Sequence, residues 1–250
     1  MNEIMLFRGD TILNQTIPER YRSCGIVSKL INGGNPAFVQ RSGLVKSIQE
    51  HINPLTEAER IFLSKSEFIS FSEEKIVAKQ HCLYDKVQNK YLSNELIECE
   101  DYYETRYVFS LDISECIPLS PEEGIFLLEY NCNQVSRKSD GLNENVIEFQ
   151  VESGWYQCEV CKRNEKHKMY IVDCVKFLEY HKEYCLNKGA FLNAKEDKEW
   201  LVLPRDYHTD LRGYSSMIPV SDIWKAELYF LKSEGKRNPD QFTIQGTILK

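Results

Sequence analysis

Three short segments, far apart in the 250-residue chain, carry side chains suited to binding and activating a charged substrate. In the first segment, Arg8 ends an apolar stretch and Gly9 follows it. A guanidinium can bind two phosphate oxygens at once, and a glycine leaves the adjacent backbone unhindered. Taken alone, Arg8 is more simply interpreted as an exposed arginine at the end of a strand.

The second segment alternates serines with large apolar residues. Ser70 and Ser72 are separated by Phe71, and Ile69 precedes them. Since consecutive side chains of a strand point to opposite faces, we expect the two hydroxyls on one face and the apolar groups on the other. The serines could line one wall of a cleft, although a half-buried edge strand would show the same alternation.

The third segment places carboxylates before a short, very apolar stretch. Asp197 and Glu199 are two positions apart, and Trp200 to Pro204 follows them. On extended backbone, residues two apart face the same way, so the two carboxylates are expected to form a pair. Repulsion in a confined site would raise the pKa of at least one of them. The simpler alternative is an acidic loop that leads into a core strand.

Taken together, the three segments resemble the Arg–Ser–Glu class of mono-ADP-ribosyltransferases, which includes bacterial ADP-ribosylating toxins. That family has an arginine after its first strand, a Ser-Thr-Ser strand, and a Gln/Glu-x-Glu motif that ends in the catalytic glutamate. Here Phe71 stands in place of the threonine, and Asp197 stands at the first position of the last motif. The resemblance lies in anchor segments between residues 4 and 231, and residues 85–185 do not align.

The resemblance implies that NAD is the substrate and that the bond between nicotinamide and ribose breaks. Glu199 would hydrogen-bond the ribose 2′-hydroxyl and oppose the positive charge of an oxocarbenium-like transition state. Arg8 and Gly9 would hold the diphosphate. Ser70 would orient Glu199 and the ribose, and Ser72 would form part of the cleft wall. No Gly-x-Gly-x-x-Gly follows a strand, so we do not expect NAD to bind as in dehydrogenases.

The acceptor of the ADP-ribose is less well defined. Asp197 would hydrogen-bond or deprotonate the acceptor, and the segment 186–196 corresponds to the loop that touches targets in the family. A net charge of −7 argues against long contacts with a duplex but is compatible with a short single strand. We expect an intracellular toxin that modifies a nucleic-acid base, of the toxin–antitoxin or phage-defence kind, with an antitoxin as a possible partner. The alternatives are a toxin that modifies a protein side chain and a non-catalytic interaction protein with the same fold.

The elements that must position these residues indicate an α+β fold, with helices mainly early and strands mainly late. The resemblance implies a split core of two packed, mostly antiparallel sheets around the NAD cleft, with flanking helices. We expect Gly9 and Asp10 to form a turn and Ser42 to cap a helix. Expected strands are 4–8, 67–72, 102–113, 124–130 and 199–204, with a hairpin over 155–175 and helices over 42–52, 73–80 and 175–185.

The amino-acid composition limits the classes of protein to which the chain can belong. With 42% hydrophobic and 12% aromatic residues, the chain can bury a sizeable core, and we read a single domain over 1–250 with an insertion around 131–190. The start has no basic segment followed by a long apolar one, and no apolar stretch approaches the roughly 18 residues that span a bilayer. We therefore expect a soluble, cytoplasmic chain without membrane contact.

The cysteines offer a competing interpretation. Nine cysteines, an odd number scattered through strand-like stretches, favour reduced thiols over a disulfide framework. Cys158 and Cys161, with His181 and Cys185, approximate a structural zinc site. Such sites place the Cys-x-x-Cys pair in a turn, whereas 155–161 is expected to be a strand, so we expect no metal and leave zinc as the alternative.

Overall fold

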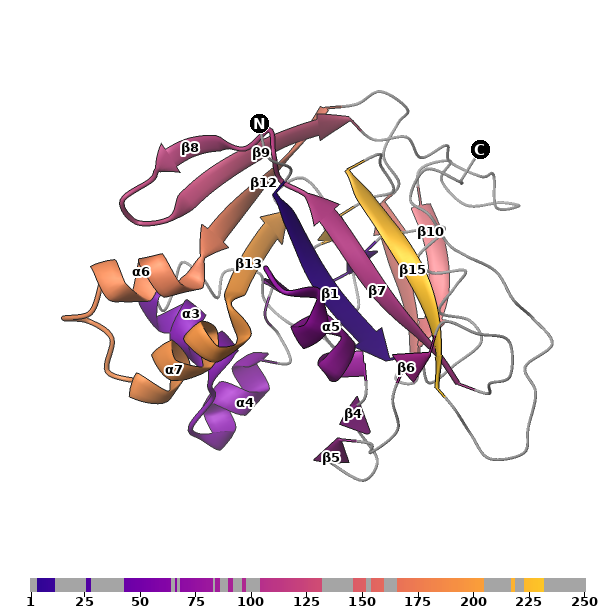
Figure 1. The fold of residues 1–250 in the computed structure, drawn as a ribbon, viewed down its shortest axis with the longest axis horizontal. Coiled ribbons are helices and arrows are strands. Elements are labelled where there is room, and N and C mark those ends of the chain that lie inside the picture. Colours follow the sequence, from indigo (N-terminus) through magenta and orange to yellow (C-terminus); the bar gives the residue numbers. More distant parts are fainter. Residues whose placement is uncertain are drawn as a thin grey trace.

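A sheet of nine strands carries the fold. The computed structural model describes residues 4–11, 26–27, 43–63, 66, 68–82, 84–85, 90–91, 96–97, 104–131, 146–151, 154–159, 166–204, 217–218 and 223–231. These residues form a mixed α+β structure in which a large antiparallel sheet is flanked by a few helices (Figure 1). The expected α+β class is therefore confirmed.

Every pair of neighbouring strands in this sheet is antiparallel. The order across the sheet is β6 (Leu96–Ile97), β15 (Trp224–Leu231), β7 (Glu104–Asp112), β1 (Met5–Thr11), β3 (Ile69–Ser72), β13 (Glu199–Pro204), β12 (Lys166–Asp173), β9 (Ile125–Asn131) and β8 (Ile117–Ser120). Three small sheets pair β2 (Ile26–Val27) with β14 (Met217–Ile218), β4 (Tyr84–Asp85) with β5 (Lys90–Tyr91), and β10 (Val146–Val151) with β11 (Gly154–Glu159).

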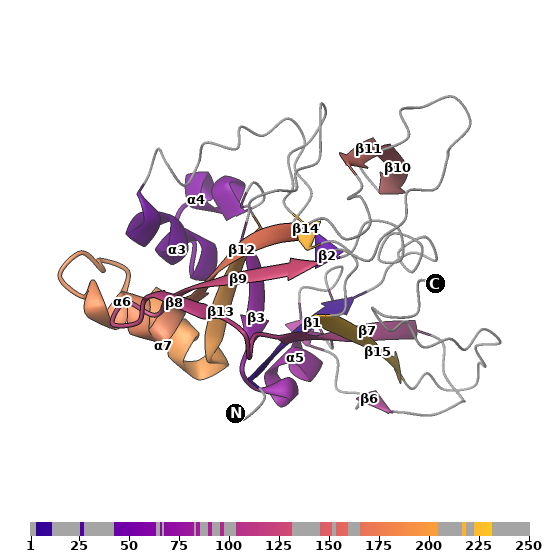
Figure 2. The same cartoon turned by 90° about the horizontal axis from the view of Figure 1, so that it is seen from above.

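The large sheet is nearly divided between β1 and β3. Strand β1 pairs with β7 along all seven of its residues, but it pairs with β3 through Phe7 and Ser72 alone. On either side of this pair the two halves of the sheet diverge, as Figure 2 shows from above. Two packed sheets were expected, but the described strands form one hydrogen-bonded sheet, in which a single pair of residues joins β1 to β3.

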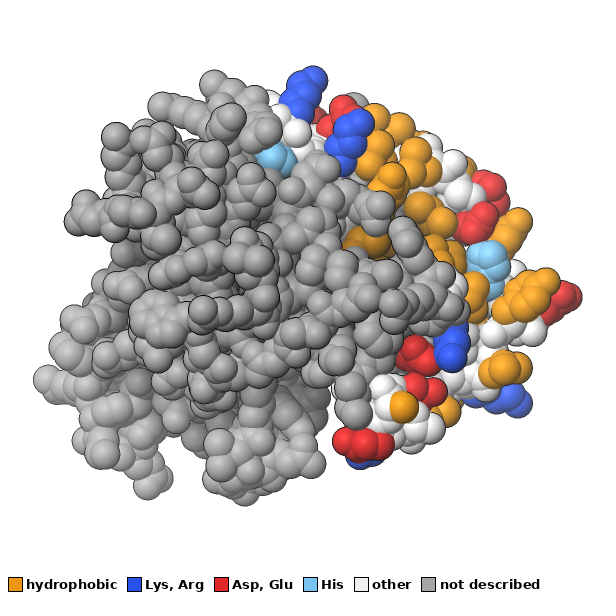
Figure 3. All heavy atoms as spheres, turned by 180° about the vertical axis from the view of Figure 1, so that it is seen from behind, with side chains coloured by type: hydrophobic (Ala, Val, Ile, Leu, Met, Phe, Trp, Pro, Cys, Tyr) orange, Lys and Arg blue, Asp and Glu red, His pale blue; other side chains and the backbone are white. Residues whose placement is uncertain are grey.

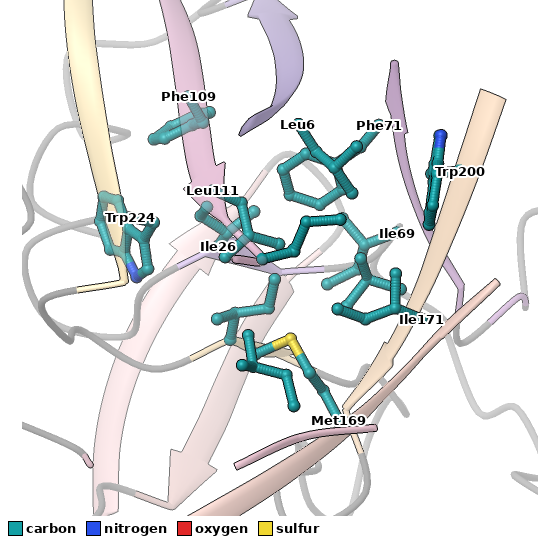
Figure 4. Close-up of a cluster of buried hydrophobic side chains, with 14 of the residues drawn as sticks. Leu6, Ile26, Ile69, Phe71, Phe109, Leu111, Met169, Ile171, Trp200 and Trp224 are labelled. Carbon is teal, nitrogen blue, oxygen red and sulfur yellow. The ribbon is translucent and has the colours of Figure 1, made fainter. Parts of the chain in front are cut away.

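One hydrophobic core fills the angle between the two halves. Leu6, Phe109 and Trp224 come from the first half, and Ile69 and Ile171 come from the second (Figure 4). All five side chains are buried. Burial of this apolar surface is the main force that holds the splayed halves together, since within the described strands a single pair of residues joins β1 to β3.

Helices cover the opposite face of the second half. This layer consists of α3 (Leu44–Ile52), α6 (Cys174–Tyr180) and α7 (Lys188–Asp197), with α4 (Glu57–Leu63) beside α3 (Figure 1). Strand β13 is apolar on both faces because Trp200 and Val202 enter the first core, whereas Leu201 and Leu203 pack under the helices. Helix α5 (Lys75–Cys82) lies against β1 of the first half.

One local expectation at the N-terminal end is wrong, and a second concerns a residue outside the described ranges. Gly9 and Asp10 form no turn but continue β1, opposite Val108 and Tyr107, because β7 offers a partner along the whole strand. Helix α3 begins after Gly43, which has a φ of 77° and provides no side-chain cap. Ser42, the expected cap, lies outside the described residues.

The expected hairpin over 155–175 is also wrong. Strand β11 pairs with β10, whereas β12 pairs with β9 and β13 inside the large sheet. Alternation of side chains predicts a strand but carries no information about its partner. Within 131–190, the described residues from Lys166 onward therefore belong to the main fold, and β10 and β11 form a separate small sheet.

The segment expected to be a target-contacting loop is helical. Residues Lys188–Asp197 form α7. The side chain of Asn187 caps α7 by accepting a hydrogen bond from the backbone N–H of Ala190 at 3.1 Å. This helix delivers its C-terminal end directly to the start of β13.

The edge strand β8 exposes apolar side chains. Ile117 and Leu119 are about half exposed, and Pro118 between them is a residue that edge strands tolerate. Seen from behind, the described part of the surface carries several hydrophobic side chains among charged ones (Figure 3). None of the helices that the structure describes has the length and apolar character needed to cross a membrane.

Candidate active site

Strands β1, β3 and β13 are neighbours, and they bring together three residues that are far apart in the sequence. Ser72 is paired with Phe7 on one side and with Glu199 on the other. The guanidinium of Arg8 donates from Nη1 to the carbonyl oxygen of Ser70 at 3.0 Å. The hydroxyl of Ser70 is hydrogen-bonded to the carboxyl group of Glu199. Arg8, Ser70 and Glu199 thus form one contiguous cluster.

The splay of the sheet explains how Arg8 enters this cluster. Alternation along β1 places Arg8 on the face opposite to that of Phe7, the residue that pairs with β3. Beyond that pair, β1 and β3 have no further paired residues in the described part of the chain. The Arg8 side chain, rather than another backbone group of β1, satisfies the carbonyl of Ser70. The gap in strand pairing therefore brings the guanidinium beside β3.

Glu199 is the most perturbed acid of the site. Its pKa is raised from 4.5 to about 7, chiefly because the carboxyl group is desolvated, and the charge of Asp197 raises it further. The hydrogen bond from Ser70 and the nearby His81 and Arg8 act in the opposite direction. The carboxyl group is therefore poised to change its protonation state near neutral pH, a property common among catalytic acids and bases.

A buried histidine holds Ser70 from behind. His51 of α3 is 8% exposed. Its Nε2 lies 2.8 Å from the Ser70 hydroxyl, and its Nδ1 lies 2.7 Å from the hydroxyl of Ser66. The Ser66 hydroxyl also accepts a hydrogen bond from the backbone N–H of Phe68 at 3.3 Å. Both ring nitrogens of His51 are thus used inside the protein.

The direction of these hydrogen bonds follows from the charge of Glu199. An ionised carboxylate can only accept, so Ser70 must donate to Glu199 and accept from Nε2 of His51. When the ring carries one proton, on Nε2, its Nδ1 accepts from Ser66. In that state Ser66, His51, Ser70 and Glu199 form a chain in which every hydroxyl proton points toward the carboxylate. Hydrogen bonds in such a chain polarise one another and orient the carboxylate.

Asp197 and Glu199 do not form the expected pair on extended backbone. Asp197 is the last residue of α7, and Glu199 is the first residue of β13. Between them, Lys198 adopts a left-handed conformation with φ of 44° and ψ of 54°. Such a conformation is costly for a residue other than glycine. This sharp turn separates the two carboxylates onto different elements, although Asp197 still raises the pKa of Glu199.

Ser72 stabilises this turn. Its hydroxyl donates to the carbonyl oxygen of Asp197 at 2.6 Å and accepts from the backbone N–H of Glu74 at 3.0 Å. Lys198 is held as well, since its Nζ lies 2.7 Å from Oε1 of Glu74. Ser72 was expected to line a cleft wall, but its hydroxyl is engaged inside the protein, where it positions the end of α7 next to β3.

The solvent side of Glu199 carries a second pair of polar residues. His81, in the last turn of α5, places Nε2 at 3.7 Å from Oδ2 of Asp197. Their side chains are 49% and 40% exposed, so both remain accessible to solvent. His81 lies close enough to lower the pKa of Glu199. The site therefore has a buried side built from hydroxyls and an imidazole, and an open side built from an imidazole and a carboxylate.

Cys174, Cys185 and His181 lie in other environments. Burial, followed by the charge of Glu199, raises the pKa of Cys174 well above its usual value, so this thiol stays neutral. His181 lies 2.9 Å from Oε2 of Glu123, and Cys185 donates to the carbonyl of Asn187 at 3.7 Å. Cys161 lies outside the described residues. Within the described ranges, no three His, Cys, Asp or Glu side chains are grouped so that they could hold a metal ion.

Sequence reasoning identified Arg8, Ser70, Asp197 and Glu199 but not the two histidines of the site. His51 and His81 lie in helices, 19 and 11 positions away from Ser70, and no fixed spacing links them to the strand. The one local signal was a histidine in α3 on a face that also carries buried residues such as Ile48. That signal indicates burial, but it does not indicate the partner.

Comparisons with known proteins identify no relative of this chain. No protein-family profile, curated protein or solved structure matches the chain significantly.

Proposed function

We propose that the chain is an NAD-dependent mono-ADP-ribosyltransferase with the Arg–Ser–Glu arrangement. The observation that carries this proposal is the convergence of Arg8, Ser70 and Glu199 from β1, β3 and β13. In the sequence, these three types of side chain resemble the family's anchors only in their order. In the folded chain they lie next to one another. The splayed antiparallel sheet and its flanking helices are compatible with the fold of that family.

The chemistry of the cluster suits NAD as a substrate. A guanidinium matches a diphosphate, and a carboxylate with a hydroxyl beside it matches a ribose diol. Glu199 has a pKa of about 7, so a large part of the carboxyl population is ionised at neutral pH. A desolvated carboxylate stabilises a developing positive charge more strongly than one in water does.

Each residue then has a defined task. Glu199 accepts a hydrogen bond from the ribose 2′-hydroxyl and opposes the positive charge that develops on the ribose as the nicotinamide bond breaks. Ser70, held by His51, fixes the orientation of that carboxylate. Arg8 binds the diphosphate, with Gly9 beside it. Nicotinamide leaves as a neutral group, so no general acid is required.

We further propose that the enzyme acts inside the cell as a toxin and that its acceptor is a nucleic-acid base. The net charge of −7 favours a short single-stranded acceptor over a long duplex. Growth arrest on expression, relieved by Glu199→Gln, is the expected behaviour. Harmless expression of the active wild type would contradict the toxin role without affecting the enzymatic proposal.

Incubation with NAD labelled in the adenylate phosphate tests the activity directly. We expect the wild type to release nicotinamide and to transfer label to macromolecules of a bacterial extract, with nuclease treatment removing the label. Glu199→Gln should slow nicotinamide release by about 10²–10³-fold, the usual effect of removing one preorganised electrostatic group.

A matched control is Glu129→Gln on β9, where a surface carboxylate lies 3.0 Å from Nζ of Lys168. This variant should release nicotinamide at the wild-type rate. The proposal is wrong if the wild type releases none, or if Glu199→Gln is as active as the wild type. Label that resists nuclease but not protease would move the acceptor from nucleic acid to protein.

A further inference from the structure

The open side of the site holds a histidine and a carboxylate that NAD cleavage does not require. Nε2 of His81 faces Oδ2 of Asp197 at 3.7 Å, and both side chains are close to half exposed. They belong to α5 and α7, which reach Glu199 from different directions. The turn at Lys198 and the hydrogen bond from Ser72 to the carbonyl of Asp197 fix where α7 ends.

We propose that His81, oriented by Asp197, is the general base that removes a proton from the acceptor, and that the acceptor is an uncharged O–H or N–H group of the nucleic acid. This inference rests on the proposed function and names the acceptor chemistry of that same site. Imidazole is the side chain that can take up and release a proton near neutral pH. Oδ2 of Asp197 lies 3.7 Å from Nε2 of His81, so its negative charge stabilises the imidazolium that forms when the ring takes up the acceptor's proton.

The transfer exchanges one bond at ribose C1′ for another and releases one proton. The bond from ribose C1′ to the nicotinamide nitrogen breaks, and its electron pair leaves with nicotinamide. The acceptor oxygen or nitrogen forms the new bond to C1′ and gives its proton to Nδ1 of His81, since Asp197 faces Nε2. The imidazolium then loses a proton to water. The products are the ADP-ribosylated acceptor, nicotinamide and one proton.

A second histidine–carboxylate pair shows what a closed, structural contact looks like in this protein. His181 and Glu123 are 2.9 Å apart, and their side chains are 22% and 27% exposed. The ring of His181 also packs on Phe177, with ring centroids 4.6 Å apart. The His81–Asp197 pair is longer and more exposed, and it lies beside a carboxyl group with a raised pKa. Its geometry leaves room for an acceptor at the ring.

The acceptor chemistry follows from the imidazole of His81, which stands beside Asp197 on the open side and can take up a proton. An uncharged hydroxyl or amino group gains nucleophilicity only as its proton is withdrawn, so it needs a base in the transfer step. Bond cleavage to nicotinamide needs no such base, and the two steps can therefore be separated by mutation.

The test compares His81→Asn with wild type in two measurements on the full chain. One measurement is nicotinamide release from NAD in buffer, and the other is transfer of label to macromolecules of a bacterial extract freed of small molecules. We expect transfer to fall at least about 100-fold in His81→Asn, as for the loss of a general base. Nicotinamide release should fall by no more than about threefold, since the His81 side chain is 49% exposed and solvent screens its interaction with Glu199. Added imidazole should restore part of the transfer in His81→Ala.

The matched control is His181→Asn, which removes the other histidine–carboxylate pair and should leave both measurements unchanged. An equal loss of release and transfer in His81→Asn would overturn the proposal, because it would mean that His81 acts only through Glu199 or through folding. Unchanged transfer would overturn it as well, and so would a wild type that cleaves NAD but labels nothing. A wild type that releases no nicotinamide instead refutes the proposed function itself.

Discussion

The two sides of Glu199 are built from different chemistry. The buried side consists of Ser70, His51 and Ser66, linked by hydrogen bonds of 2.7–2.8 Å in which no member needs a charge. The open side consists of Asp197 and His81, which are 40% and 49% exposed and lie 3.7 Å apart. The same carboxyl group is thus held by neutral donors on one side and faced by ionisable groups on the other.

This difference follows from what desolvation allows. A charge buried behind Glu199 would cost several kcal/mol unless it were fully paired, whereas hydroxyls and a neutral imidazole can orient a carboxylate at little cost. On the solvent side, water screens Asp197 and His81, so charge is tolerated there. The carboxyl group of Glu199 is therefore oriented from inside the protein, and we propose that proton transfer takes place on the open side.

Apart from its loss of activity, Glu199→Gln should show the largest expected effect, a change in the free energy of unfolding. A pKa of about 7 in the folded state, above the ordinary 4.5, means that ionising Glu199 destabilises the fold by about 3 kcal/mol once the pH exceeds 7. The cost disappears below the ordinary pKa, where the group is protonated in both states. Urea unfolding should therefore show Glu199→Gln more stable than wild type by up to about 3 kcal/mol near pH 8.5 and equally stable near pH 4.5.

Glu129→Gln again serves as the control, since its surface ion pair is expected to contribute less than about 1 kcal/mol at either pH. A stability difference between Glu199→Gln and wild type that did not grow with pH would mean that the carboxyl group is solvated. The contrast between a buried and an open side would then lose its basis.

The next effect concerns the buried side. His51→Leu removes the group that donates to Ser70 and leaves the Ser66 hydroxyl without its acceptor, so nicotinamide release should slow about 10- to 100-fold. His51→Gln can still present an N–H to Ser70 and should recover part of the rate. Measured kcat and KM should show the loss mainly in kcat, because His51 positions Glu199 rather than binding NAD.

If His51→Gln released nicotinamide as slowly as His51→Leu, the loss of the hydrogen bond to Ser70 would not be the cause of the slower release. Circular dichroism and thermal unfolding of both variants separate this outcome from a failure to fold. A rise in KM with unchanged kcat would assign His51 to substrate binding. The proposed difference between the buried and the open side of Glu199 would then be wrong.

The smallest effect is a change in pH dependence. Nicotinamide release by the wild type should fall about tenfold for each pH unit below a pH of about 7, as Glu199 becomes protonated. Asp197 raises the pKa of Glu199, so Asp197→Asn should move this acid limb to lower pH. Rates measured between about pH 5 and pH 8 would show the shift, and an acid limb that moved to higher pH would contradict the assigned interaction.

Sequence patterns predicted the strands around the site better than the backbone that connects them. The alternation at Ser70 and the apolar run after Glu199 correspond to β3 and β13, because side-chain periodicity is a local property of a strand. The turn expected at Gly9 and the extended pair of Asp197 and Glu199 were wrong. Both depend on partners, β7 in the first case and the C-terminal end of α7 in the second.

The sequence by itself determined which chemical groups are present and that Arg8, Ser70 and Glu199 lie on or beside strands. Only the tertiary structure decided that β1, β3 and β13 are neighbours, that His51 lies behind Ser70, and that His81 faces Asp197. The physical reason is that strand order and helix docking are selected by burial of a shared core, which draws on residues from the whole chain. No short window of sequence contains that information.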